Sequence, residues 1–312
     1  MTYRASRLRH HRVAQHAYVQ RERIQTTQPI PVSGQAVPDA PHTSSSSGVT
    51  DASPTTSPPG PPADALLHRH HLRRERPLER DTLKVISHGR TISTLIPPVK
   101  PWFEELLLLS GLKDLAKCGY SMVNKGMINA FFERWHHETS SFHIPHGEMT
   151  ITLDDVTCLL HLQIRGRFLD HESIGKEEVL DLLVEMLGVT FESALGEINK
   201  TRGSHVSYNY LDQMFEDEIQ HAREADGDVE QVTIHRRFAM RANLLYLVGT
   251  QIFVNTSATY TDIMYLWFFA DFETIHQWNW GASCLVYLHT KLDEGIKWNT
   301  KQITDNMSLM TI

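Results

Sequence analysis

The sequence predicts a mainly α protein: a single helical domain with one short β-hairpin, preceded by a disordered N-terminal arm that is basic and rich in Pro and Ser. Beyond residue 98, apolar residues recur at helical spacing in several segments. One short stretch instead alternates apolar and polar residues, as a strand does. No pattern alternates strands with helices, so a parallel sheet is not expected. We place the arm at residues 1–97, the helical domain at 98–295 and an unmatched tail at 296–312.

The N-terminal arm differs from the rest of the chain in charge and composition. Residues 1–90 contain 13 Lys and Arg against 7 Asp and Glu, which leaves 17 against 30 for residues 91–312. Pro, Ser, Thr and Gly dominate residues 25–63, a segment that cannot bury enough apolar surface to offset the entropy of ordering. Arginines in residues 4–23 and 68–80 can neutralise phosphates, so nucleic-acid contact through the arm stays open beside a solvated tail.

Cysteine usage and hydropathy limit the class of protein. Cys118, Cys158 and Cys284 lie far apart without a C-x-x-C pair, which indicates neither a disulfide framework nor a zinc knuckle. A reducing compartment, cytosol or nucleus, fits this pattern. The apolar runs at residues 244–248 and 263–270 are shorter than the ~18 residues that span a bilayer, so we expect no membrane association.

The first predicted helices lie in residues 101–110 and 121–135. Pro101 suits the first turn, the leucines that follow are expected to be buried, and Gly111 offers a helix stop. In the second helix the apolar side chains fall along one side, which is more typical of a core than of a binding groove. They are Met127, Ile128, Phe131, Phe132 and Trp135.

Further helices are expected after residue 175. Residues 176–187 begin with acids and precede a glycine, which is the polarity of a helix. Residues 209–224 carry an apolar face of Leu211, Met214, Phe215 and Ile219. The acids expected largely on the outer face of that helix are Glu216, Asp217 and Glu218. Residues 234–253 become increasingly apolar, and residues 260–292 predict two helices, the second closely packed through Gly281.

The stretch SFHIPHGEMTITLDDVTCLLHL, residues 141–162, predicts a hairpin that leads into a short helix. The side chains that can share one strand face are Phe142, Ile144, Met149 and Ile151. Pro145 and Gly147 supply the turn. Thr152 can cap the helix by accepting from the backbone N–H of Asp155, and carboxylates in the first turn complement the helix dipole.

The same region raises the hypothesis of a metal site. Its candidate ligands are His136, His137, His143, His146 and Glu148. However, no H-E-x-x-H or paired cysteines occur, and His143 and Ile144 should point to opposite faces of a strand, which makes convergence difficult. A Gly-rich phosphate loop, a G-x-S-x-G elbow and a kinase motif set are absent from the sequence. We therefore expect no catalytic residue, no metal site and no cofactor.

Two blocks of the sequence resemble the plant mobile domain family, which includes the Maintenance of Meristems proteins and many transposon-carried copies. Residues 133–156 follow E-R-W, then E-T, then F-H-[LI]-P-x-G-E-M-T-[IV]-T-L-[ED]-D-V. Residues 241–282 follow R-A-x-L-L-x-L-[LV]-G-x-x-[LI]-F and a W-G-A helix, and the resemblance covers roughly residues 100–295. The family-motif residues that we take as candidates for functional weight are Trp135, His143, Glu148, Asp155, Arg241, Trp280 and Gly281.

The chain departs from the family pattern at three places. His136 and His137 stand where the family has Arg-Pro, and residues 161–163 stand where it has Gly-Leu-Pro. The family domain continues beyond the W-G-A helix, whereas residues 296–312 match nothing in the resemblance. We therefore expect a copy shortened at its C-terminal end, and a non-functional shortened copy is one alternative.

The resemblance implies a nuclear plant protein linked to transposon silencing, genome integrity and meristem development, without established catalytic residues. The family's aminotransferase-like label implies pyridoxal phosphate, but no lysine here has a recognisable cofactor context. Some relatives carry a metallophosphatase domain, whose G-D-x-H-G and G-N-H-E elements are absent from this sequence.

The leading hypothesis is a non-enzymatic nuclear interaction protein, with the cytoplasm as the alternative location. The acidic body, especially residues 216–230, favours a basic protein partner over direct DNA contact. The alternative is a transposon-encoded nucleic-acid-binding protein that uses the basic arm. His143 and Glu148, which lack a complete structural explanation, are expected in a buried polar contact or a partner-facing site.

Overall fold

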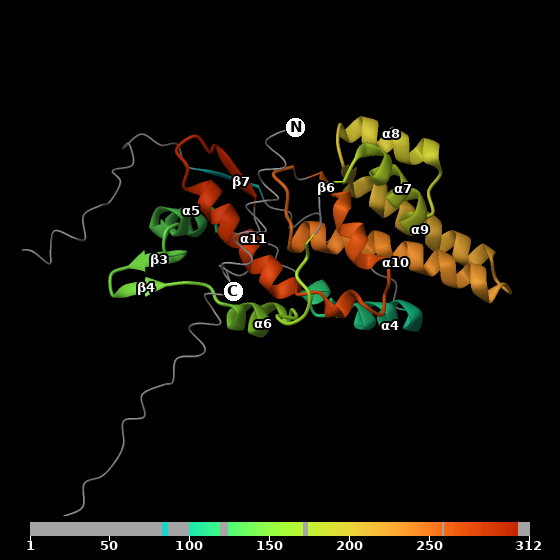
Figure 1. Ribbon diagram of the computed structural model, residues 1–312, viewed down its shortest axis with the longest axis horizontal. Helices are drawn as coiled ribbons and strands as arrows, with labels where there is room; N and C mark the ends of the chain where they lie inside the picture. Colours follow the sequence, from blue (N-terminus) through green and yellow to red (C-terminus); the bar gives the residue numbers. More distant parts are fainter. Residues whose placement is uncertain (1–82, 87–99, 119–123, 171–173, 258, 305–312) are drawn as a thin grey trace, which may run out of the picture. The chain divides into compact units, whose positions relative to one another are not determined.

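The computed structural model describes residues 83–86, 100–118, 124–170, 174–257 and 259–304 (Figure 1). Helices dominate these residues, which confirms the predicted mainly α fold. The α-helices are α4 (Pro101–Ser110), α5 (Lys125–Arg134), α6 (Leu153–Leu160), α7 (Lys176–Leu187), α8 (Phe191–Thr201), α9 (Tyr208–Glu224), α10 (Val229–Gln251) and α11 (Trp280–Gly295). The 3-10 helices are η1 (Leu115–Lys117), η2 (Ile263–Phe269) and η3 (Ile275–Gln277). The predicted arm lies outside the described residues, except for residues 83–86.

Short strands form three small sheets in the described residues. β2 (Trp135–His136), β3 (Ser141–Ile144) and β4 (Gly147–Met149) form an antiparallel sheet in that order, and β3 and β4 are the predicted hairpin. β5 (His205–Ser207) pairs antiparallel with β6 (Tyr260–Asp262). β1 (Lys84–Ile86) pairs in parallel with β7 (Gln302–Thr304). The sequence therefore predicted one β element where the described residues form three small sheets.

The β1–β7 pair differs from the predicted domain boundaries. Residues 83–86 were placed in the arm and residues 302–304 in the tail, yet Leu83, Val85 and Ile303 are buried in the core. A strand of three residues is too short to show a recognisable alternation of apolar and polar positions. The two strands β1 and β7 also lie far apart in the sequence, so no local pattern predicts their pairing.

The helix of residues 101–110 begins and ends as predicted but is buried on one side only. Its first residue is a proline, and Gly111 ends it with φ 74°, the left-handed conformation that glycine adopts without strain. Phe103 and Leu107 are buried, whereas Leu108 and Leu109 are exposed. The prediction that all its leucines are buried was therefore wrong, because the helix packs against α10 and η3 with one face.

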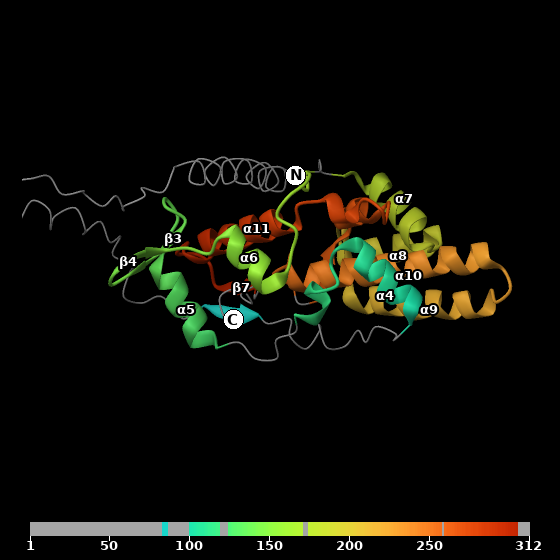
Figure 2. The ribbon, with the colours of Figure 1, turned by 90° about the horizontal axis from the view of Figure 1, so that it is seen from below.

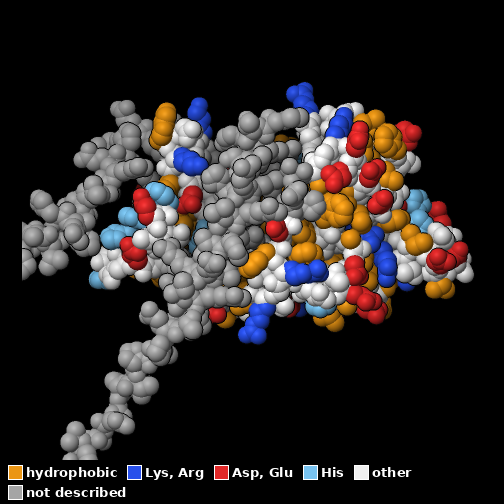
Figure 3. All heavy atoms as spheres, in the orientation of Figure 1, with side chains coloured by type: hydrophobic (Ala, Val, Ile, Leu, Met, Phe, Trp, Pro, Cys, Tyr) orange, Lys and Arg blue, Asp and Glu red, His pale blue; other side chains and the backbone are white. Residues whose placement is uncertain are grey.

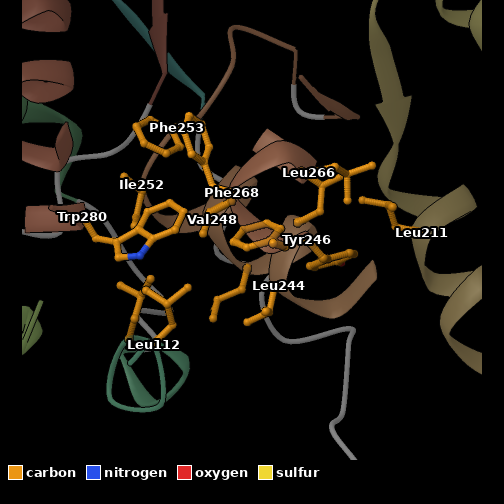
Figure 4. Packing of buried hydrophobic residues seen from close by; sticks show 14 of the residues in the cluster. Leu112, Leu211, Leu244, Tyr246, Val248, Ile252, Phe253, Leu266, Phe268 and Trp280 are labelled. Carbon is orange, nitrogen blue, oxygen red and sulfur yellow. The ribbon is translucent and has the colours of Figure 1, made fainter. Parts of the chain in front are cut away.

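Helix α10 lies at the centre of the core. Its residues 239–251 are buried without interruption, as the increasingly apolar sequence predicted, because α4, α7, α9, β6 and η2 pack around it. α9 and α10 lie side by side as a helical hairpin in Figures 1 and 2. Figure 4 shows aromatic and aliphatic side chains of α10, η2 and α11 in one packed cluster, including Val248, Phe268 and Trp280.

Two further findings concern the helices. The region of residues 260–279, expected to hold one α-helix, contains the 3-10 helices η2 and η3. α8 was not foreseen, although Thr190 caps it by accepting from the backbone N–H of Ser193. None of the described helices is both long and apolar enough to cross a membrane.

Candidate functional site

Trp135 joins the three-stranded sheet to α11. Its indole Nε1 donates to Oδ1 of Asp293 over 2.8 Å. Its ring centroid lies 4.9 Å from that of Phe142 and 5.1 Å from that of His289. Burial raises the pKa of the Asp293 carboxyl, which the hydrogen bond from Trp135 partly offsets, and burial lowers the pKa of His289 to about 4. The Trp135 side chain is therefore a buried link between two elements far apart in sequence.

Arg241 joins α10 to two other segments through backbone carbonyls. Its Nε donates to the carbonyl of Phe269 over 3.0 Å, and its Nη2 donates to that of Ala270 over 2.9 Å. Its Nη1 reaches the carbonyl of Met186 in α7 over 3.5 Å. Burial, with a smaller effect of Arg237, lowers the pKa of Arg241 to about 10, so the guanidinium is still charged at neutral pH. The planar fork of arginine suits this arrangement of acceptors.

Trp280 and Gly281 place the start of α11 inside the core. The indole Nε1 of Trp280 donates to the carbonyl of Ile275 over 3.0 Å. The backbone N–H of Gly281 donates to the carbonyl of Gln163 over 2.8 Å. A Cβ atom at Gly281 would lie 2.7 Å from Cγ2 of Ile164 and 3.0 Å from the Gln163 carbonyl oxygen, so only glycine permits this approach.

Asp155 forms the capping box at the start of α6. Its backbone N–H donates to the hydroxyl of Thr152, as predicted, and its carboxylate accepts from the backbone N–H of Thr152 over 2.8 Å. This reciprocal pair satisfies two donors that the helix itself leaves without partners. The carboxylate therefore has a local structural role, although it is exposed.

His143 and Glu148 face each other across the hairpin, and both are exposed to solvent. They are paired in the β3–β4 register, and the ring centroid of His136 lies 5.5 Å from that of His143. Oε2 of Glu148 accepts from the hydroxyl of Ser141 over 2.9 Å. Figure 3 shows histidine side chains gathered at this hairpin. We call the exposed face made of His136, His143 and Glu148 the hairpin surface.

The structure brings only part of the hypothetical histidine metal site together. His136 and His143 are neighbours, whereas Nε2 of His137 lies 3.3 Å from a carboxylate oxygen of Glu138. In the part of the chain that the structure describes, ligand atoms of three other side chains lie within 4.8 Å of one another. These side chains are Glu218, His221 and His235.

The sequence did not predict this second cluster, because Glu218 was expected on the solvent-facing side of its helix. The structure contradicts that expectation, since Glu218 is 5% exposed. The available signal was the spacing Glu-x-x-His within a predicted helix, which puts Glu218 and His221 one turn apart on one face. The contribution of His235 depends on how α9 and α10 pack, which the sequence does not state.

The family model of the plant mobile domain matches residues 111–312. The chain belongs to the plant mobile domain family. The matched range includes all seven motif residues, and it also includes residues 296–312, which the resemblance had left unmatched.

Three relatives from Arabidopsis thaliana are similar to this plant mobile domain chain. Protein MAIN-LIKE 1 is 35% identical over 59% of this chain and 34% of its own length. Protein MAINTENANCE OF MERISTEMS is 32% identical over 56% of this chain and 33% of its own length. A serine/threonine-protein phosphatase 7 long form homolog is 26% identical over 81% of this chain but 18% of its own length. The chain therefore spans about a third or less of the length of these relatives. No solved structure matches the chain.

A pocket of about 390 Å³ lies beside α7 and α8, and no motif residue of this plant mobile domain is among the described residues that line it. It is lined by Lys176, Val179, Ile198, Asn199, Arg202, Gly203 and Ser204. The described residues of this lining include no carboxylate, histidine or cysteine, and Lys176 donates to the side chain of Asn199 over 3.2 Å. Among these described residues, no carboxylate or imidazole is present to act as a general acid or base.

Proposed function

We propose that this chain is a non-enzymatic interaction protein of the nucleus, with a role in transposon silencing, genome integrity and meristem development. Membership of the plant mobile domain family supports this proposal, as does the similarity to a relative named for the maintenance of meristems. The observation that carries it is the exposure of His143 and Glu148 on the hairpin surface.

The hairpin surface differs from the buried motif residues in what its side chains contact. Trp135, Arg241 and Trp280 donate to groups in other segments of the fold, and their side chains are buried. His143 and Glu148 instead contact residues of their own small sheet and point to solvent. Packing therefore accounts for the first group, whereas an exposed polar pair is available to a partner.

The charge of the body indicates a basic protein partner. Residues 91–312 carry 30 Asp and Glu against 17 Lys and Arg. Exposed acids gather near the loop between α9 and α10, where Figure 3 shows a group of acidic side chains. They are Glu216, Glu224, Asp226, Asp228 and Glu230. Such a field attracts basic surfaces and repels the phosphates of nucleic acid.

The proposal is tested by affinity capture from plant nuclei with the full chain as bait. The double variant His143→Ala, Glu148→Ala should lose a partner that the parent chain recovers, while both melt at the same temperature. His146→Ala is the matched control, because His146 is exposed in the turn of the same hairpin. Recovery of the same proteins by the parent and the double variant, or of chaperones only, would refute the hairpin surface as a partner site.

Location is tested separately with a fluorescent fusion of the full chain. We expect the signal in the nucleus, and an exclusively cytoplasmic signal would contradict that part of the proposal. Replacing the arginines at residues 4–23 and 68–80 tests whether the basic arm directs import.

A second candidate function is nucleic-acid binding through the same basic arm, which lies outside the described residues. The excess of 13 Lys and Arg over 7 Asp and Glu in residues 1–90 favours it. Binding through phosphates must weaken as salt rises, because bound cations are released. A filter-binding series in which affinity does not fall with salt would rule out this mode.

A further inference from the structure

Three potential metal ligands meet between α9 and α10, remote from the hairpin surface in sequence. Oε2 of Glu218 lies 2.7 Å from Nδ1 of His235, and Oε1 of the same carboxylate lies 3.4 Å from Nδ1 of His221. The two imidazole ring centroids are 5.3 Å apart. We propose that Glu218, His221 and His235 form a binding site for one divalent transition-metal ion, with zinc as the preferred ion.

The helical hairpin brings these residues together by simple geometry. Glu218 and His221 are three residues apart in α9, so both side chains lie on one helix face. Glu218 precedes Ala225, the C-terminal cap of α9, by seven positions, and His235 follows Asp228, the N-terminal cap of α10, by seven positions. Positions equally far from the turn of an antiparallel hairpin lie opposite each other, so His235 reaches the carboxylate from the facing helix.

Burial of the Glu218 carboxylate indicates that the site is built for a cation. Its side chain is 7% exposed, and a carboxylate removed from water is costly unless an opposite charge accompanies it. In the described part of the chain its ion-pair partners are the two histidines, and no lysine or arginine accompanies them. A neutral imidazole offers one N–H, whereas a metal ion would supply a full compensating charge.

The donor set fits zinc better than calcium or magnesium. Two imidazole nitrogens and one carboxylate oxygen are ligands that zinc accepts, with a water molecule in the fourth position. Calcium and magnesium require oxygen ligands almost exclusively. Zinc bonds of about 2.0–2.2 Å in a tetrahedron place neighbouring ligand atoms roughly 3.3–3.6 Å apart. The observed contacts use different oxygens of Glu218, with Oε2 2.7 Å from His235 and Oε1 3.4 Å from His221. One ligand atom from each of the three residues lies within 4.8 Å of the others, so side-chain rotation has to close the set around the ion.

The three-residue cluster is open to solvent on one side, and the ring of His235 is packed against a neighbouring side chain. The His221 side chain is 51% exposed and opens the cluster to solvent, whereas that of His235 is 24% exposed. The ring of His235 packs edge-on against Phe238 at 6.4 Å between centroids, which restrains its orientation. A bound ion would replace the direct contact between His235 and Glu218 and would link the two helices near their turn.

The experiment uses the full chain, stripped with a chelator and titrated with Zn²⁺ in competition with a chromogenic chelator. Arm histidines His68, His70 and His71 are replaced with Gln in every protein, so that this run of arm histidines does not contribute. We expect one Zn²⁺ per chain and a higher melting temperature with the ion than without it. Titration with Co²⁺ should produce the strong visible absorption of a four-coordinate site.

Glu218→Gln and His221→Gln test the assignment against Glu216→Gln, an exposed acid two residues earlier on the same helix. The first two variants should lose at least about tenfold in Zn²⁺ affinity, the smallest loss typical of a disturbed zinc site, and should lose the Co²⁺ absorption. His221 is half exposed, so its variant remains folded even if Glu218→Gln does not. Absence of Zn²⁺ binding by the parent, or equal affinity in His221→Gln and Glu216→Gln, would overturn the proposal.

Discussion

Arg241→Lys should destabilise the domain strongly, because lysine cannot reproduce the three contacts of the guanidinium. Arg241 donates to the carbonyls of Phe269 and Ala270 at the end of η2, and it reaches that of Met186 in α7. An ammonium group on a flexible stem is a point charge and cannot span this fork. The variant keeps a buried charge and leaves backbone acceptors without donors.

The magnitude follows from the two short hydrogen bonds, of 3.0 and 2.9 Å. Hydrogen bonds from a charged donor contribute about 1.5–3 kcal/mol each, and an unpaired buried acceptor costs about 1–3 kcal/mol. If lysine retains one of the two, the loss in the free energy of unfolding is about 2–4 kcal/mol. For a domain of this size, that corresponds to a fall in melting temperature on the order of 10 °C.

Urea denaturation of the full chain at pH 7, followed by circular dichroism at 222 nm, measures this loss. Arg237→Lys is the matched control, because Arg237 is exposed one helical turn away and should change the free energy by less than about 0.5 kcal/mol. If Arg241→Lys is as stable as Arg237→Lys, the contacts of Arg241 with the backbone carbonyls do not stabilise the fold.

Three further variants test the core around α11 by urea denaturation. His289→Gln should make the stability less sensitive to acid, because the pKa of His289 is about 4 in the folded state and 6.5 ordinarily. As the pH falls from 6.5 to 4, the free energy of unfolding of the parent should therefore drop by up to about 3 kcal/mol more than that of the variant. Asp293, whose pKa burial raises, acts in the opposite direction in both proteins, and equal pH profiles would exclude the effect. Gly281→Ala should cost about 1–3 kcal/mol, because the added Cβ meets Ile164 and the Gln163 carbonyl; an unchanged midpoint would mean that α11 shifts freely. Trp135→Phe should cost about 1–3 kcal/mol by leaving the Asp293 carboxyl without its donor, and adding Asp293→Asn should recover part of that loss.

Features that depend on neighbouring residues were predictable from the sequence. The β3–β4 hairpin, its turn at Gly147 and the Thr152 cap of α6 all lie within a dozen residues. Turn chemistry, alternation and capping operate over that distance, so the sequence contains the full cause. The end of α4 at Gly111 is local in the same sense.

Features that depend on distant partners were missed. The β1–β7 pair joins strands of three residues from opposite ends of the described chain. The β5–β6 pair likewise joins residues on the two sides of the α9–α10 hairpin. Neither strand of either pair is long enough to show a pattern by itself, so the tertiary contact decides the conformation.

The wrong prediction at Glu218 has a different cause. Its position in the helix indicated burial, but its charge was taken to indicate exposure. Glu218 follows Phe215 by three residues and Leu211 by seven, which places it on the buried stripe of α9. An acid on an apolar stripe is unusual, since such groups are seldom buried without a partner. The conflict between position and residue type was itself a signal of a polar site.

The motif residues of the plant mobile domain divide according to what they hold together. Trp135 connects β2 to α11, Arg241 connects α10 to η2 and α7, and Gly281 connects α11 to the segment after α6. Each spans a long stretch of sequence, so its replacement must lower the stability of the fold. His143 and Glu148 contact their own sheet, and replacing them should leave the melting temperature unchanged. A loss of partner binding without a loss of stability is therefore expected at these two positions and at none of the buried three.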